Sequence, residues 1–223
     1  MSEERLGTDD LTFGQKMGVH FMNVMGWGWN RHPVPFNAEL VRTFGTRKAI
    51  EYLTVLGNIS TRAEKLWGEA DSQMMVGMSA FWNGCLYCSV GHVRAANIAI
   101  HRDRKLLCPL THYRIPALSE LKDGEAISAI RKSLAGDDYA STRRLANRMY
   151  ELKIEGAEST GSDEDEMLLA LVDGWSFLND CSILSGVDAR ADRVPPLSIV
   201  AKDKALVQRY QDALGAADMI PNP

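Results

Sequence analysis

Two cysteines and a histidine give this chain its clearest chemical signature. Cys85 and Cys88 are separated by two residues, and His92 follows four residues after the second cysteine. Two thiols at this spacing can close a disulfide within one helical turn, and a histidine one turn further along can move protons for them. The motif therefore indicates thiol redox chemistry or a metal site.

The neighbouring residues place this motif at the start of a helix. Asn83-Gly84 is a strong helix stop, because both residues tolerate the left-handed backbone, and a new helix is predicted from residue 85 or 86 to about 101. Unpaired N–H groups at a helix start stabilise an anion, so a thiol pKa near ~8.5 can fall to roughly 3.5–7.5 there. At about 100° per residue, one narrow stripe of this helix carries Cys88, His92, Ala95 and Ala99, with Cys85 at its edge. The alanines would let a neighbouring helix approach closely, which predicts that the thiols lie in a narrow crevice.

A zinc site is the competing interpretation of the same cysteines. Cys108 and His112 could join Cys85 and Cys88 in a structural Cys3His site. Against zinc, a chain of this length can build a hydrophobic core and does not need a metal staple, and zinc would leave His92 without a role. Cys181 is predicted to be an inert buried residue. The other histidines, at positions 20, 32 and 101, carry no paired motif.

Composition excludes several classes of function. The chain has 223 residues, a formal net charge of −4 and no basic stripe, so nucleic acid is not an expected partner. No stretch reaches the ~18 apolar residues of a membrane span, and the N-terminus has no apolar signal core. Only four cysteines occur, which is no disulfide framework. These features predict a cytoplasmic protein without membrane contact.

The hydrophobic periodicity predicts an almost entirely helical chain. The expected helices lie near 11–25, 37–57, 71–82, 85–101, 117–121, 123–135, 139–155, 163–186 and 202–214, and Ser60 or Thr61 could cap a further short helix before residue 71. The acidic run 163–166 is expected to be a solvated helix start, and the Trp27-Gly28-Trp29 stretch is expected to cover a core. Residues 1–223 are predicted to form a single all-α domain.

The segment from Gln73 to His92 resembles the alkyl hydroperoxidase D-like and carboxymuconolactone decarboxylase family. The family pattern is a glutamate, eleven residues and then C-x-x-C-x-x-x-H, often with Asn-Gly before the first cysteine. The cysteine and histidine part matches in full, and the stretch 171–187 looks more weakly like a later helix of the family. The resemblance extends over roughly residues 35–190.

This resemblance implies an oligomeric helical protein, a trimer or hexamer, that reduces organic hydroperoxides as a thiol peroxidase or disulfide oxidoreductase. Cys88 would attack and become a sulfenic acid, Cys85 would close the disulfide, and His92 would relay protons. A dithiol reductant would reset the enzyme, and no cofactor or metal is expected. Gln73 stands where the family has its glutamate, so this side chain can orient a partner but cannot take up a proton. Tyr87 stands where some peroxidase members have a histidine.

Two alternatives remain open at this stage. One is a carboxymuconolactone decarboxylase-like enzyme that acts on a small organic acid or lactone and does not need both thiols. The other is a non-catalytic helical oligomer that holds zinc through Cys85, Cys88, Cys108 and His112.

Overall fold

The computed structural model describes residues 7–30 and 33–220, and within these ranges 74% of the residues are helical and none lies in a strand. The all-α prediction is therefore confirmed. The helices are α1 (Phe13–Asn30), α2 (Asn37–Phe44), α3 (Thr46–Trp82), α4 (Leu86–Arg104), α5 (Ile115–Ser119), α6 (Asp123–Ser133), α7 (Ala140–Lys153), α8 (Asp163–Leu184) and α9 (Lys204–Ala216). Short 3-10 turns lie at His112–Arg114, Asp137–Tyr139 and Ile199–Lys202.

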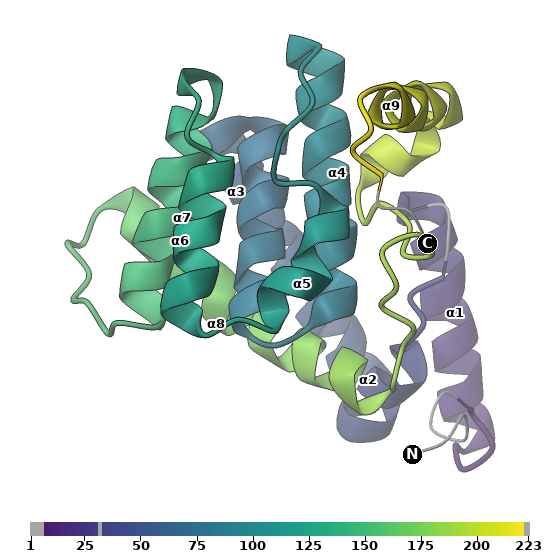
Figure 1. Cartoon of the computed structure of the whole chain (residues 1–223). Helices are drawn as coiled ribbons and strands as arrows, with labels where there is room; N and C mark the ends of the chain where they lie inside the picture. The colour runs from purple at the N-terminus through teal and green to yellow at the C-terminus, as the bar shows by residue number, and fades with distance from the viewer. Residues whose placement is uncertain (1–6, 31–32, 221–223) are drawn as a thin grey trace.

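The centre of the molecule is the pair formed by α3 and α4, which Figure 1 shows between α6 and α7 on one side and α1 and α9 on the other. Gly77 allows the two central helices to approach closely. A Cβ at this position would lie 2.8 Å from Cγ2 of Val93 and 3.1 Å from its backbone nitrogen. The buried apolar residues of α3, α4, α7 and α8 form one continuous core against this pair. α4 is consequently buried around most of its circumference.

Two glycines that were not predicted to interrupt helices do so between residues 37 and 82. Gly45, with φ 72°, separates α2 from α3, and Gly68, with φ 81° and ψ 166°, kinks α3. The prediction of one helix over 37–57 that ends at Gly57-Asn58 was wrong, because both of those residues lie inside α3. Glycine permits a left-handed backbone without requiring it, so composition alone does not select which glycine breaks a helix. α1 likewise continues through Gly26 and Gly28 instead of ending at Gly26.

The boundaries around the cysteine motif agree with the prediction. α3 ends at Trp82, Gly84 takes φ 79°, and α4 begins at Leu86 with Cys85 as its N-cap. The backbone N–H of Cys85 donates to the carbonyl of Ala80 at 2.9 Å, which fixes the turn. α4 extends three residues beyond the predicted end, to Arg104.

α8 crosses beneath the central pair and supplies the third wall of the core. It begins with Ser162 as N-cap, whose hydroxyl accepts the N–H of Asp165 at 3.2 Å. Asp163 and Glu166 are exposed as predicted, whereas Asp165 is buried and paired with Arg148. Among the described helices α8 alone is long and apolar enough to cross a membrane, although no such stretch was predicted from the sequence. Half of that stretch is buried inside the molecule, where α8 packs against α3 and α7.

Candidate active site at the start of α4

The two cysteines of the motif are in contact at the N-terminus of α4. Cys85 has an extended backbone (φ −90°, ψ 95°), and its Sγ accepts the backbone N–H of Cys88 at 3.4 Å. The two residues approach to 3.1 Å, and both are almost fully buried. The two thiols also share a hydrogen bond, so their sulfurs are close enough for disulfide formation to be tested.

The surroundings of the two thiols shift their pKa values in opposite directions. The hydrogen bond from the Cys88 thiol, with further bonds from Ser182 and from backbone N–H groups, holds the pKa of Cys85 below its ordinary value. The same hydrogen bond, together with burial and the charge on Cys85, raises the pKa of Cys88. Of the two thiols, Cys85 is therefore the one that loses its proton more readily.

Ser182 was missed by the sequence analysis, although it contacts both thiols. It is buried on α8, and its hydrogen bonds to Cys85 and Cys88 lower the pKa of each thiol. A serine near the end of a long apolar helix, almost one hundred residues from the motif, gives no signal in a sequence read alone. Only the packing of α8 against the start of α4 brings it to the cysteines.

His92 lies one turn beyond Cys88 and is held by Gln73 of α3. The Oε1 of Gln73 lies 2.8 Å from Nδ1 of His92. An amide oxygen can only accept, so Nδ1 carries the proton and Nε2 is left as an acceptor. Burial lowers the pKa of His92 to about 3, so its imidazole is neutral near pH 7. The ring of Trp175 packs edge-on to it, with centroids 5.0 Å apart.

A cavity of about 560 Å³ reaches this site. Its walls come from α1, residues 34–36, α2, both sides of the kink in α3, the start of α4, α8 and residues 197–199. Cys88, His92 and Gln73 line it, whereas Cys85 does not. Tyr87 also lines the cavity and packs edge-on against Phe36, with centroids 6.1 Å apart, and burial raises the pKa of its phenol. Much of the remaining lining is apolar, contributed by Met22, Met25, Val34, Ile50, Leu53, Leu56, Leu178 and Leu197.

Glu69 lines the cavity, and the sequence analysis gave it no role. It lies on α3 four residues before Gln73, and its carboxylate is bound by Arg102 Nη1 at 2.8 Å and by the Ser198 hydroxyl at 3.2 Å. The spacing from Gln73 is the available signal, because residues four apart share one helix face. Asp71 is buried on the opposite side, where it accepts a hydrogen bond from Thr142 at 2.5 Å. Glu69, unlike Asp71, therefore shares the cavity with Gln73, and Glu64 is a second carboxylate of its lining.

The four residues of the proposed zinc site do not come together. Among the residues that the structure describes, no three histidines, cysteines or acids are grouped in a way that could hold a metal ion. Leu110, between Cys108 and His112, accepts a hydrogen bond from Asn97, which lies twelve residues beyond Cys85 on α4. At 1.5 Å per residue, this places the second pair about 18 Å along the helix from the first. Burial raises the pKa of Cys108 to about 12 and that of Cys181 to about 12, so both are poor nucleophiles.

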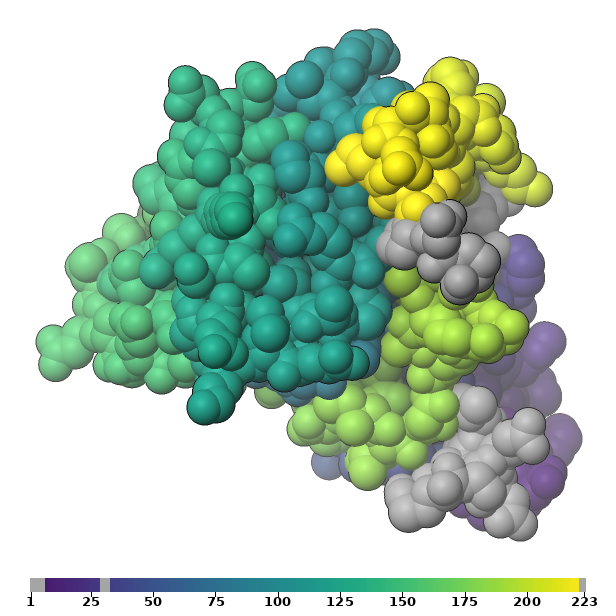
Figure 2. Space-filling view, in the orientation of Figure 1, coloured from purple at the N-terminus to yellow at the C-terminus, as the bar shows by residue number. Residues whose placement is uncertain are grey.

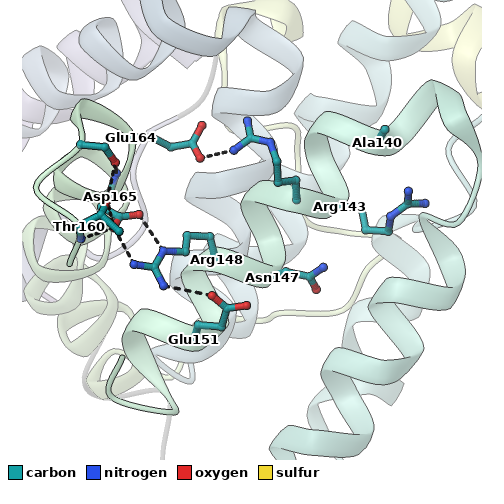
Figure 3. Close-up of a pocket in the computed structure, with 10 residues that line it drawn as sticks. Ala140, Arg143, Asn147, Arg148, Glu151, Thr160, Glu164 and Asp165 are labelled. Carbon is teal, nitrogen blue, oxygen red and sulfur yellow. Dashed lines mark hydrogen bonds and ion pairs between the residues drawn. The ribbon is translucent and has the colours of Figure 1, made fainter. Parts of the chain in front are cut away.

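A second pocket, of about 500 Å³, lies between α7 and the start of α8 (Figure 3). Its arginines are already engaged by the protein. Arg148 binds Asp165 and Glu151, Arg144 pairs with Glu164, and Arg143 donates to the carbonyl of Leu134. The lining residues include no cysteine or histidine, so this pocket takes no part in the chemistry of the motif.

Comparison with known proteins yields no match: no protein-family model, no curated protein and no solved structure resembles the chain significantly.

Removing the hydroxyl of Ser182 is expected to make the pair less acidic. Hydrogen bonds to charged groups contribute about 1.5–3 kcal/mol, so Ser182→Ala is expected to raise the pKa of Cys85 by about one unit or more. Alkylation of the pair near neutral pH should then slow about tenfold, as measured by iodoacetamide labelling across a pH series. Ser185→Ala is the matched control, because the hydroxyl of Ser185 donates to the carbonyl of Cys181 one turn further along α8. Equal pH profiles for the two variants would contradict a role for Ser182.

Acid is expected to destabilise the fold through its buried histidines. Burial lowers the pKa of His92 to about 3 and that of His112 to about 3, from an ordinary value of 6.5. The unfolded chain therefore takes up protons first, and stability decreases as the pH falls from about 6.5 toward 3. At about 1.4 kcal/mol per pH unit, each histidine costs about 3 kcal/mol by pH ~4.5. Urea denaturation from neutral pH to pH ~4.5 measures this loss, which should be about half as large in His92→Gln. If His92→Gln lost as much stability between neutral pH and pH ~4.5 as the wild type, His92 would not be a source of the acid sensitivity.

Proposed function

We propose that this protein is a thiol peroxidase or disulfide oxidoreductase that reduces organic hydroperoxides with the Cys85–Cys88 pair. The supporting observation is that Cys88, His92 and Gln73 share the wall of one largely apolar cavity while Cys85 touches Cys88 from behind. The cavity volume is within the range of small-molecule sites. An apolar cavity of this kind suits an alkyl or aryl hydroperoxide better than a highly charged substrate.

The proposed reaction begins at the thiol that faces the cavity. Cys88 loses its proton to Cys85 or to Nε2 of His92, and its thiolate attacks the terminal peroxide oxygen. The O–O bond breaks, Cys88 becomes a sulfenic acid, and the departing alkoxide takes up that proton to leave as an alcohol. The Cys85 thiolate then attacks the sulfur of the sulfenic acid, the S–O bond breaks, and the departing hydroxide takes a proton from solvent to become water. The product is a disulfide between Cys85 and Cys88.

A dithiol reductant is proposed to restore the pair. Because Cys88 faces the cavity and Cys85 does not, the reductant is expected to attack Cys88 Sγ and release Cys85. A thiol of lower pKa leaves faster, and the pKa of Cys85 is the lowered one. A two-electron dithiol then closes its own disulfide and frees Cys88. A reducing compartment such as the cytoplasm would supply such a reductant.

Intact mass tests the proposal directly. The reduced, metal-free protein is treated with one equivalent of cumene hydroperoxide, and loss of two hydrogens should map to the peptide that holds Cys85 and Cys88. Cys181→Ser is the matched control, since Cys181 is buried and of raised pKa, and it should still lose two hydrogens. Failure of the wild-type protein to form the disulfide would refute the peroxidase. Turnover of a lactone by a variant that lacks both cysteines would replace it with the decarboxylase-like alternative.

A further inference from the structure

α1 is apolar on two opposite faces, although only one of them is covered. The inner face carries Val19 and Met22, which are buried, and Met22, Met25 and Gly26 line the cavity. On the outer face Phe13 is 81% exposed, and four further large side chains are each more than half exposed, namely Met17, Phe21, Val24 and Trp27. Figure 1 and Figure 2 show α1 at the rim of the molecule. A helix face this apolar is normally buried, yet no segment among residues 7–30 and 33–220 covers the outer face of α1.

The outer stripe follows a seven-residue repeat. Phe13, His20 and Trp27 occupy one position of the repeat, Gly14, Phe21 and Gly28 a second, and Met17 and Val24 a third. Such a repeat keeps one seam of a helix facing another helix along its whole length. The stripe carries no carboxylate, and His20 is its one titratable residue. The stripe therefore offers no carboxylate that could form an ion pair with a basic partner surface.

In two antiparallel copies of α1, large residues of this stripe lie opposite small residues of the same stripe in the other copy. When two copies of α1 lie antiparallel about a point between residues 20 and 21, Phe13 meets Gly28, Gly14 meets Trp27, Met17 meets Val24 and His20 meets Phe21. A Cβ added at Gly14 or Gly28 would meet no atom within 4 Å, so there is open space above both glycines for the large side chain of the partner. A two-fold contact requires this kind of self-complementarity.

We propose that the outer face of α1 is the interface between two copies of this chain, packed antiparallel about a two-fold axis near Phe21. The contact covers the apolar stripe and holds α1 against the cavity that Met22 and Met25 line. A helix of 18 residues offers a seam of about 27 Å.

Sedimentation velocity of the full chain over a concentration series tests the interface. The wild type is expected to sediment as a dimer or a higher two-fold assembly, and Met17→Glu and Phe21→Glu are expected to shift it to smaller species by weakening association at least tenfold. Leu121→Glu is the matched control, because it places the same charge on an exposed leucine outside α1 and should leave the assembly intact. Circular dichroism checks that each variant retains its helical content.

Cross-linking tests the antiparallel register. Phe21→Cys lies beside the axis and should form an intermolecular disulfide under mild oxidation, whereas Phe13→Cys, far from its own copy, should not. A wild type that is monomeric at every concentration, or an assembly that both glutamate variants leave unchanged, would overturn the proposal. Binding of the monomer to neutral lipid vesicles, lost in Met17→Glu, would assign the stripe to a membrane surface instead and would equally overturn it.

Discussion

Replacing Cys88 by serine is expected to abolish hydroperoxide turnover, with a loss of at least about 10³-fold in kcat/KM. Cys88 is the thiol of the pair that lines the cavity, so it is the sulfur that a bound hydroperoxide can reach. A serine hydroxyl keeps the volume but is not ionised near neutral pH, and it cannot form the sulfenic acid. A coupled assay with excess dithiol measures the loss.

Cys85→Ser is expected to behave differently, and this difference makes the test specific. Cys88 can still be oxidised, but no neighbouring thiolate can close the disulfide, so the sulfenic acid should persist and react with dimedone. A Cys88→Ser variant that turns over like the wild type would refute the assignment. A sulfenic acid on Cys85 in that variant would reverse the two roles.

This reversal is a real alternative, because access and acidity favour different cysteines. Hydrogen bonds from Cys88, Ser182 and backbone N–H groups lower the pKa of Cys85. Cys88, whose pKa is raised, is the thiol that faces the cavity. In the proposed mechanism, Cys85 is the resting anion that can receive the proton of Cys88 at the moment of attack. The lowered pKa of Cys85 also suits it to leave when the disulfide is reduced.

The sequence predicted the site where the signal was local. The helix stop at Asn83-Gly84, the new helix start at residue 85 or 86 and the alignment of Cys88 with His92 all depend on residues within one or two turns. The contact between Gln73 and His92 was expected only from the family resemblance, and the structure places these side chains 2.8 Å apart. Local capping rules and a twenty-residue motif therefore described the inner wall of the cavity.

The parts that could not be predicted depend on packing between distant segments. Ser182 and Trp175 reach the motif because α8 lies across α3 and the start of α4, which no spacing in the sequence reveals. The kink at Gly68 was missed because glycines 57 and 68 look alike until tertiary contacts select one of them. The wall of the cavity that α1 supplies was missed because the periodicity of a helix does not show which distant segment it packs against.

Replacing His92 by asparagine is expected to lower kcat/KM by about 10²- to 10⁴-fold, the range that general acid–base groups contribute. Gln73 Oε1 fixes the proton on Nδ1. In the proposed mechanism the unprotonated Nε2 takes the proton of Cys88 and returns it to the departing alkoxide. Stopped-flow measurement of the first oxidation isolates this step from reduction of the disulfide. An unchanged rate in His92→Asn would remove the histidine from the mechanism.

Gln73→Glu supplies the converse test, because it changes the basicity of His92 without removing the ring. Burial beside a neutral amide lowers the pKa of His92 to about 3, so the wild-type imidazole is a weak base and stays neutral above pH ~4. An ionised carboxylate within hydrogen-bond distance stabilises the imidazolium and raises that pKa by about one to three units. The stronger base should speed oxidation of Cys88 about tenfold near neutral pH. The rate should also decrease below the raised pKa, where His92 becomes protonated, whereas the wild type shows no such decrease above pH ~4. A merely structural contact between Gln73 and His92 would leave the shape of the pH profile unchanged.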